Sequence, residues 1–386
     1  MLTEKELEKA LDLMQSRLDA VNTLFIRKVA EQIKAIGELG QANINRLVIM
    51  ADMGADIAEV NQQLIDATGL NMVDLQKVYE AAMEDTYTDP RFKRVLDQTP
   101  LPPEAKERLA QYTRSVYEQT AQTMENLSNT TAVSDPYKAA VDTAITAVTS
   151  GLMDDGSATR SVIRSLGYNG LQVRYESGYH RRLDTAVRQN IVDGANQISQ
   201  NGAKMLGEEL GYDAYEISAH LHSAPDHEPV QGHVLLKEEY DKMQSGEDFE
   251  DVDGRHFEGF KRPIAEWNCM HFALPFSTKH SVRRYTDDQI REWNEKNDAG
   301  CEIDGKHYSI YKASQLMRET ETEVRRWKDT ANAARIAGDE VLRRQCQQHI
   351  NALGNKYTQI VKASGLPSRR ERMAVEGFKM VKLKDQ

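Results

Sequence analysis

A regular spacing of apolar side chains near the start of this sequence constrains its fold more than any other feature. The separations are three or four residues, which places the side chains on one face of an α-helix. The residues concerned are Leu7, Leu11, Met14, Leu18, Val21, Phe25, Val29, Ile33 and Ile36. We expect one long amphipathic helix, with Thr3 as N-cap, Glu6 completing a capping box, and Gly37 and Gly40 at its end. Its apolar face packs either in a helical bundle or on a partner subunit.

Further helical patterns continue to residue 210. We expect helices over 42–51, 56–67 and from 71 through 82, the second of them stopped by Thr68 and Gly69. Thr99–Pro103 predicts a stiff linker or a corner. The helices expected after it cover 104–127, 136–151, 157–166 with Ser157 as its cap and Gly167 at its end, and 171–210.

The pattern changes after Gly211. Alternating residues predict a strand over 214–220, with weaker strands at 234–236 and 257–260, and the acidic stretch 238–254 predicts a solvated loop. Later segments predict a helix over 286–295, a hairpin over 301–308 that turns at Asp304 and Gly305, charged helices over 311–336 and 339–364, and a basic tail that is extended or loosely ordered.

These patterns predict an α+β fold that is mostly α. We divide it into an N-terminal helical region (1–98), a helical region leading into the core domain (99–210), a His-rich α+β domain with a short sheet (211–310), and a helical hairpin with the basic tail (311–386).

Composition excludes several classes of protein. The net charge of -11 argues against a nucleic-acid binder that uses its whole surface. Three widely spaced cysteines form no disulfide framework, which favours a reducing compartment. The N-terminus has no apolar signal segment, and no apolar run approaches 18 residues. We therefore expect a soluble intracellular protein without membrane spans.

Histidine is concentrated in one part of the sequence. Seven of the ten histidines lie between residues 213 and 280, and Cys269 lies two residues from one of them. Tetrahedral zinc needs four nitrogen or sulfur donors, and this region supplies them. The candidate zinc ligands are His220, His222, His227, Cys269 and His271. Their spacing differs from that of a zinc finger, so a set of histidines hydrogen-bonded at a sheet edge remains an alternative.

Other chemistry stays open at the same place. His227 and His271, oriented by Asp226 or Glu266, form a candidate acid–base pair of a nuclease, with Gln231 and Arg255 as candidate phosphate contacts. Cys269 lacks the Gly-rich oxyanion turn of a thiol enzyme. The sequence contains no P-loop, GxGxxG, HExxH or GxSxG motif. In the basic tail, Arg369, Arg370 and Arg372 are candidate nucleic-acid contacts.

Two short motifs carry a family resemblance. The first runs from Glu216 to His220, continues with Pro225-x-His227 and ends at Gln231-Gly232. The second is Trp267-Asn268-Cys269-x-His271 followed by Pro275-Phe276. Together they resemble the phage minor capsid protein 2 family of head-morphogenesis proteins. The structural motif residues are Pro225, Gly232, Trp267, Asn268 and Pro275. The resemblance covers roughly residues 160 to 375, and the helices before it match only in being helical.

The resemblance implies a structural virion protein present in a few copies. Its implied partners are the portal protein, the major capsid protein or other head proteins, and packaged DNA. It would reside in the capsid at the portal vertex, and in the host cytoplasm during assembly, and it would act in head assembly or DNA packaging. Ala224 and Val230 depart from the family, which has Arg and an aromatic residue there. The alternative is a histidine- or metal-dependent nuclease, or another effector enzyme, packaged in the virion. Zinc is the candidate cofactor.

Overall fold

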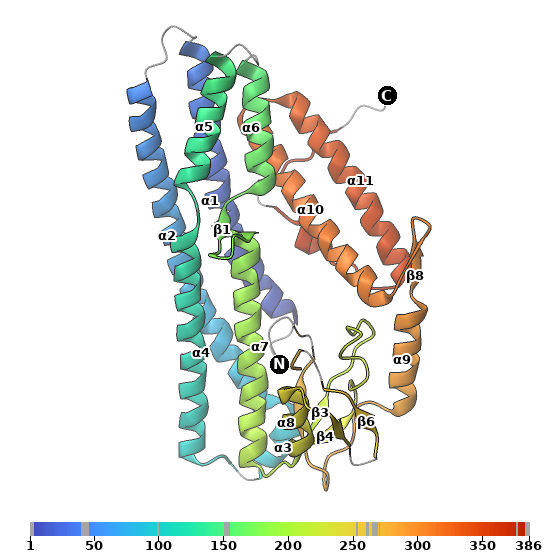
Figure 1. Ribbon diagram of the computed structural model, residues 1–386. Helices are drawn as coiled ribbons and strands as arrows, with labels where there is room; N and C mark the ends of the chain where they lie inside the picture. The colour runs from blue at the N-terminus through green and yellow to red at the C-terminus, as the bar shows by residue number, and fades with distance from the viewer. Residues whose placement is uncertain are drawn as a thin grey trace.

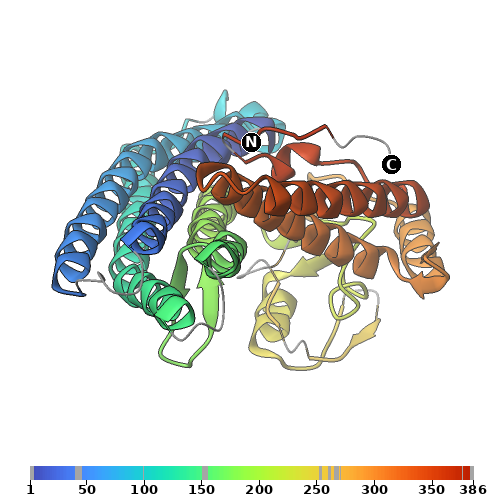
Figure 2. The same ribbon diagram turned by 90° about the horizontal axis from the view of Figure 1, so that it is seen from above.

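The computed structural model describes residues 4–39, 46–98, 100–149, 155–251, 254–259, 262–264, 269, 271–375 and 377–382. It is mostly helical with short antiparallel strand pairs, which confirms the predicted class. Long helices form a bundle, and a helical hairpin and a small sheet domain lie on the same side of that bundle (Figures 1 and 2). No helix among these residues is long and apolar enough to cross a membrane.

Within the described ranges, the bundle is built from the first helices of the chain. They are α1 (Glu4–Leu39), α2 (Arg46–Thr88), α3 (Pro90–Leu96), α4 (Pro103–Thr130), α5 (Ser134–Thr149), α6 (Asp155–Asn169) and α7 (Leu183–Glu209). Between Leu11 and Val29, where the side chains are described, the apolar face expected for the first helix is buried inside this bundle, since Phe25 and Val29 are fully buried and Leu18 nearly so. Gly37 lies within α1, and the predicted cap at Thr3 and stop at Gly40 lie outside the described residues.

The three helices expected between residues 42 and 82 are one helix, α2, so that prediction was wrong. Thr68 and Gly69 do not stop it because the surrounding packing holds the helix together. The Thr68 hydroxyl lies 2.6 Å from the Ser128 hydroxyl of α4, and the neighbouring Leu64 and Leu75 are buried in the core. A glycine within a helix costs about 1 kcal/mol, which this burial offsets.

The helix expected over 171–210 begins instead at Leu183, after a hairpin of β1 (Gln172–Arg174) and β2 (His180–Arg182). Gly167 does not end α6, which continues to Asn169. That glycine permits close packing, because a Cβ there would lie 2.6 Å from the Cα of Thr330 on a later helix. Ser157 likewise lies inside α6 and is not its cap.

A three-stranded antiparallel sheet follows α7. β3 (Ala214–Ile217) lies between β4 (Val234–Leu236) and β7 (Ala273–Phe276). The strand predicted over 214–220 thus ends three residues earlier than expected, at Ile217. The acidic stretch expected as a loop contains α8 (Lys237–Ser245) and β5 (Phe249–Glu250), which pairs with β6 (His256–Phe257). Two buried residues of that stretch, Tyr240 and Met243, explain the difference, because they pack in the core of this domain.

The C-terminal elements follow the prediction closely. They are α9 (Asp287–Ala299), β8 (Cys301–Ile303), β9 (Lys306–Tyr308), α10 (Ile310–Ile336) and α11 (Glu340–Ser364). The hairpin turns at Asp304 and Gly305, both with positive φ. The tail differs from its prediction, since Leu366 and Met373 are buried and a short 3-10 helix spans Arg370–Met373.

The main hydrophobic core crosses the regions expected from sequence. It contains residues of the bundle helices together with Ala334, Leu342 and Cys346 of the α10–α11 hairpin. A second cluster fills the hairpin and the third fills the sheet domain. The four-region division stays a prediction.

Candidate functional site

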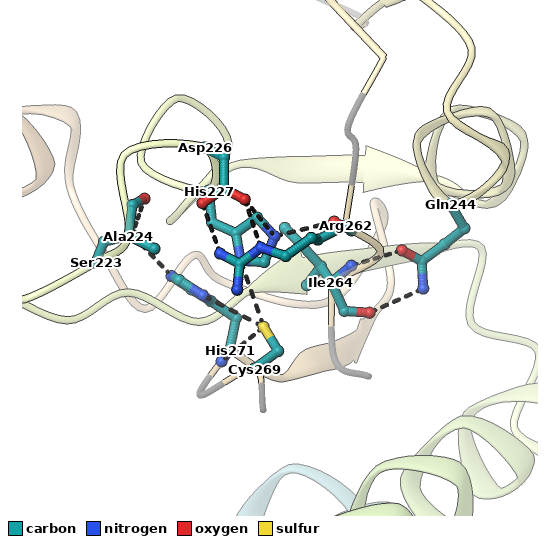
Figure 3. Close-up of polar contacts among 9 residues, drawn as sticks. All are labelled: Ser223, Ala224, Asp226, His227, Gln244, Arg262, Ile264, Cys269 and His271. Atoms are coloured by element: carbon teal, nitrogen blue, oxygen red, sulfur yellow. Dashed lines mark hydrogen bonds and ion pairs between the residues drawn. The ribbon is translucent and has the colours of Figure 1, made fainter. Parts of the chain in front are cut away.

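His227, Cys269 and His271 come together at one end of the three-stranded sheet (Figure 3). His227 lies in the loop between β3 and β4, and His271 comes just before β7. Backbone and side-chain hydrogen bonds of Ser218 with Phe272, each 2.8 Å long, extend the β3–β7 pairing beyond the strands. This extension brings the loop next to the cysteine and the second histidine.

The three side chains point their donor atoms toward one another. The Cys269 Sγ lies 3.5 Å from Nδ1 of His227 and 3.7 Å from Nδ1 of His271. The backbone N–H of His271 also donates to this sulfur at 3.4 Å. One donor atom from each of the three residues lies within 4.8 Å of the others.

The opposite ring nitrogens are held by oxygen atoms. Nε2 of His227 lies 3.0 Å from the carbonyl oxygen of Arg262, which can only accept, so Nε2 carries the proton. Nε2 of His271 lies 3.2 Å from the Ser223 hydroxyl, which itself donates to the carbonyl of Ala224. Both contacts leave Nδ1 unprotonated and directed at the sulfur.

Burial keeps these imidazoles neutral. His227 and His271 are each only 2% exposed. Burial, helped by the neighbouring His220 and His227, lowers the pKa of His271 to about 2. Burial also lowers the pKa of His227. A general acid or base works best with a pKa near the operating pH and must reach its substrate, so this arrangement suits metal ligation better than proton transfer.

His220 and His222 lie beside the cluster. The His220 ring stacks on that of His271 with 4.4 Å between centroids, and the His222 ring lies 4.7 Å from that of His220. Both ring nitrogens of His220 are buried without a hydrogen-bond partner among the described residues. Burial, followed by the charges of Arg318 and Arg369, lowers the pKa of His222. Of the five candidate ligands, three therefore converge and two stack alongside.

Asp226 supports the site through Arg262. Its two carboxylate oxygens accept from Nε and Nη2 of Arg262, both at 2.7 Å, and this contact lowers the pKa of Asp226. The backbone carbonyl of the same arginine accepts the hydrogen bond from Nε2 of His227. Asp226 also lies 3.8 Å from Nε2 of His227. The sequence prediction of an orienting carboxylate thus has a geometric counterpart, whereas Glu266 lies outside the described residues.

Gln231 fixes the loop instead of facing the cluster. Its side-chain oxygen accepts from the backbone N–H of His220 at 3.0 Å, and its amide donates to Asn294 of α9 at 2.6 Å. Arg255 contacts His233, with 2.8 Å between Nη1 and Nδ1. Neither candidate phosphate contact points its polar group at the three donors.

The structural motif residues shape the backbone around the site. Pro225 is exposed and follows Ala224, whose carbonyl accepts from the backbone N–H of His227 at 2.9 Å in a tight turn. Pro275 pairs with Tyr215 and packs against Gly207 of α7. Trp267 and Asn268 are not among the described residues. Val230, the departure from the aromatic pattern, is fully buried in the core of the sheet domain.

The three tail arginines lie on the α10–α11 hairpin. The backbone N–H of Arg369 donates to the Tyr357 hydroxyl at 2.8 Å, and Arg370 donates to the Thr358 hydroxyl at 2.7 Å. Burial lowers the pKa of Arg318, and the positive charge of Arg372 lowers it further. A nucleic-acid role for these arginines stays a prediction.

Several residues of the site were not found from sequence. Ser223 and Arg262 contact the outer ring nitrogens of the histidines, and Asn297 donates to the Ser223 carbonyl and to Glu228. Ser223 lies two residues before the Pro-x-His motif, which was a usable indication. Arg262 contributes a carbonyl that almost any residue could supply, so no sequence pattern identifies it.

The family model described as phage minor capsid protein 2 matches residues 2–362, nearly the whole chain. This chain belongs to the phage minor capsid protein 2 family. No curated protein and no solved structure matches it. The match corrects the extent of 160–375 expected from the motifs, because the bundle from α1 onward is part of the family region.

Family membership supports a structural role in the virion, in contact with other head proteins. The histidine cluster lies inside the matched region. It is therefore part of the minor capsid protein itself and not of an appended module.

Proposed function

We propose that this minor capsid protein acts in assembly of the phage head, where it contacts the portal protein and neighbouring capsid proteins. The observation that carries the proposal is the outer surface of α2, an edge helix of the bundle in both views (Figures 1 and 2). Ile65, Leu70 and Val73 on this helix are each more than half exposed. Large apolar side chains gathered on one surface often mark contact with another protein.

Net charge supports a protein partner over a direct DNA contact for most of the surface. A chain with a net charge of -11 repels the DNA backbone except where basic residues gather locally. A role in DNA packaging would therefore act through head proteins, or through local patches such as the basic tail.

A co-purification experiment tests the portal contact. The chain is co-expressed with the portal protein of the same phage, and the Val73→Asp variant is compared with Asn61→Asp, a change at an exposed polar position on the same helix. We expect Val73→Asp to weaken portal binding about tenfold or more, because the contact would bury an unpaired carboxylate. A cost of only about 1.4 kcal/mol already raises the dissociation constant tenfold. Asn61→Asp should leave binding unchanged. Equal portal recovery with both variants, or no recovery with the wild type, would refute the proposal.

The nuclease alternative is tested on the purified protein. DNA and RNA are incubated with wild type, with and without EDTA, and with His227→Ala and His271→Ala. The burial of both histidines leads us to expect no cleavage above a heat-inactivated control. Cleavage that disappears in both variants would favour the enzyme.

A further inference from the structure

The distances around Cys269 match those of a tetrahedral metal site. With bonds of about 2.05 Å to nitrogen and about 2.3 Å to sulfur, tetrahedral zinc holds a nitrogen and a sulfur ligand about 3.6 Å apart. The Cys269 Sγ lies 3.5 Å and 3.7 Å from the two Nδ1 atoms. Both separations agree with a single ion bound between the three atoms.

The number of protons available to the three donor atoms also favours a bound cation. Each Nδ1 presents a lone pair, because Nε2 of His227 donates to Arg262 and Nε2 of His271 faces the Ser223 hydroxyl. A thiol carries one hydrogen and can donate it to only one of the two nitrogens. A cation between the three atoms would satisfy both lone pairs and the sulfur at once.

The surroundings are those of metal ligands. A ligating histidine usually donates its other ring N–H to a carbonyl, hydroxyl or carboxylate, as both do here. The backbone N–H of His271 donates to the sulfur, which stabilises a thiolate. Asp226 holds the Arg262 side chain, and the backbone carbonyl of Arg262 orients His227.

We propose that His227, Cys269 and His271 bind one zinc ion, with His220 as the fourth ligand. Nitrogen and sulfur donors in a tetrahedral set select zinc over calcium or magnesium, which prefer oxygen. His220 is stacked on His271, and both of its buried nitrogens lack a hydrogen-bond partner among the described residues. In the structure the converging donors are His227, Cys269 and His271, so the His220 side chain would have to rotate to bring one of its nitrogens to the ion.

The ion would act as a structural clamp. It would join the loop after β3 to the segment before β7. Without the ion, backbone hydrogen bonds of the β3–β7 pairing are the main link between these two segments. Four protein ligands close the coordination sphere and leave no open position for a reacting water. This inference does not depend on the portal contact, and its test is separate from portal binding.

Elemental analysis and cobalt substitution test the site on the full-length protein. We expect one zinc per purified chain, and for the protein reloaded with Co²⁺ an absorption band from the thiolate together with the bands of a tetrahedral ion. Cys269→Ser should lose the thiolate band, and His271→Ala should lose the zinc. Cys346→Ala and His280→Ala, which alter a buried cysteine and an exposed histidine elsewhere, should keep one zinc each.

Affinity measurements separate ligands from supporting residues and do not rely on variants that fail to fold. In a competition titration with a chromophoric chelator, His220→Ala and Asp226→Asn should each weaken zinc binding, Asp226→Asn by about 10–100-fold. Unchanged zinc affinity in His220→Ala would overturn the assignment of His220 as the fourth ligand. A wild-type chain that neither contains nor binds zinc, or zinc retained in a folded Cys269→Ser and His271→Ala double variant, would overturn the site.

Discussion

Gly232 shows how closely single atoms constrain the loop that carries His227. Its φ is +75°, a conformation that L side chains rarely adopt, and an added Cβ would lie 2.3 Å from Cδ1 of Ile290 on α9. Its N–H also donates to the Ile217 carbonyl at 2.9 Å, which ties the end of the loop to β3. Only glycine meets these conditions together.

Replacing this glycine should therefore cost stability. We expect Gly232→Ala to lower the free energy of unfolding by about 2–5 kcal/mol, from left-handed strain of about 1–2 kcal/mol and overpacking of about 1–3 kcal/mol. The control is Gly305→Ala, where φ is +72° but no described atom lies within 4 Å, so strain alone acts. Denaturant unfolding of both variants measures the difference. Equal losses would show that the contact with Ile290 does not matter.

The sequence located the candidate site but not its full chemistry. The Pro-x-His and Cys-x-His motifs predicted that His227, Cys269 and His271 belong together, and the structure brings them within 4.8 Å. Hydrogen bonding through the Arg262 carbonyl and the Ser223 hydroxyl could not be predicted, because these groups occur throughout any chain. The stacking of His220 on His271 depends on a loop conformation that no local pattern encodes.

At the scale of the elements, a buried ion network joins β2 and α7 to α10. Arg182 contacts Asp184 at 3.1 Å and Asp329 at 2.6 Å, and Arg325 contacts Asp184 at 3.4 Å. Arg182, Asp184 and Asp329 are all buried. A buried pair fixes how two elements meet, and breaking it leaves a charge without compensation.

Removal of one partner should destabilise the protein strongly. We expect Asp329→Ala to lower the free energy of unfolding by about 3–5 kcal/mol, because Arg182 stays buried with less compensation. Glu340→Ala breaks the exposed Arg343–Glu340 pair of α11 and should cost at most about 1 kcal/mol. Thermal and denaturant unfolding of both variants give the comparison. Similar small losses would mean that the network is not important for stability.

The same network predicts a dependence on pH. Burial alone would raise the pKa of Asp184, but the charges of Arg182 and Arg325 outweigh it and hold the pKa well below the ordinary value. Burial instead raises the pKa of Asp329, and burial together with the charges of Asp329 and Asp184 raises the pKa of Asp19 on α1. The stabilising effect of the Asp184 charge is thus present above its ordinary pKa of 3.8 and is lost as the pH falls below it.

We therefore expect the stability difference between wild type and Asp184→Asn to shrink as pH falls from about 4 to about 2. This stability difference can change by at most about 1.4 kcal/mol per pH unit, the value for one proton that binds the unfolded state and not the folded state. Urea unfolding at several pH values measures both proteins. Parallel stability curves over this range would contradict the pKa assignment.

Predictions from sequence succeeded for elements whose local pattern agrees with their packing. The hairpin at Asp304 and Gly305 and the helices α10 and α11 are of this kind. They failed where tertiary contacts override a local signal. Gly69 did not break α2 because neighbouring side chains are buried, and the β1–β2 hairpin replaced the expected start of α7.

At the scale of the whole molecule, the bundle and the sheet domain are joined through α7. Gln200 of this helix donates to the His271 carbonyl at 3.3 Å, and Pro275 of β7 packs against Gly207. The candidate metal site and the exposed surface of α2 therefore belong to one connected framework (Figure 1). A partner bound to the bundle would also position the histidine cluster within the head.

The most direct test of a role in head assembly is the particle yield of a phage that lacks this gene. Electron microscopy and infectious titre are compared for wild type, the deletion, and the deletion complemented with the full-length chain. We expect the deletion to give few DNA-filled heads and a low titre, both restored by complementation. Heads of normal number, size and infectivity without this protein would contradict the account.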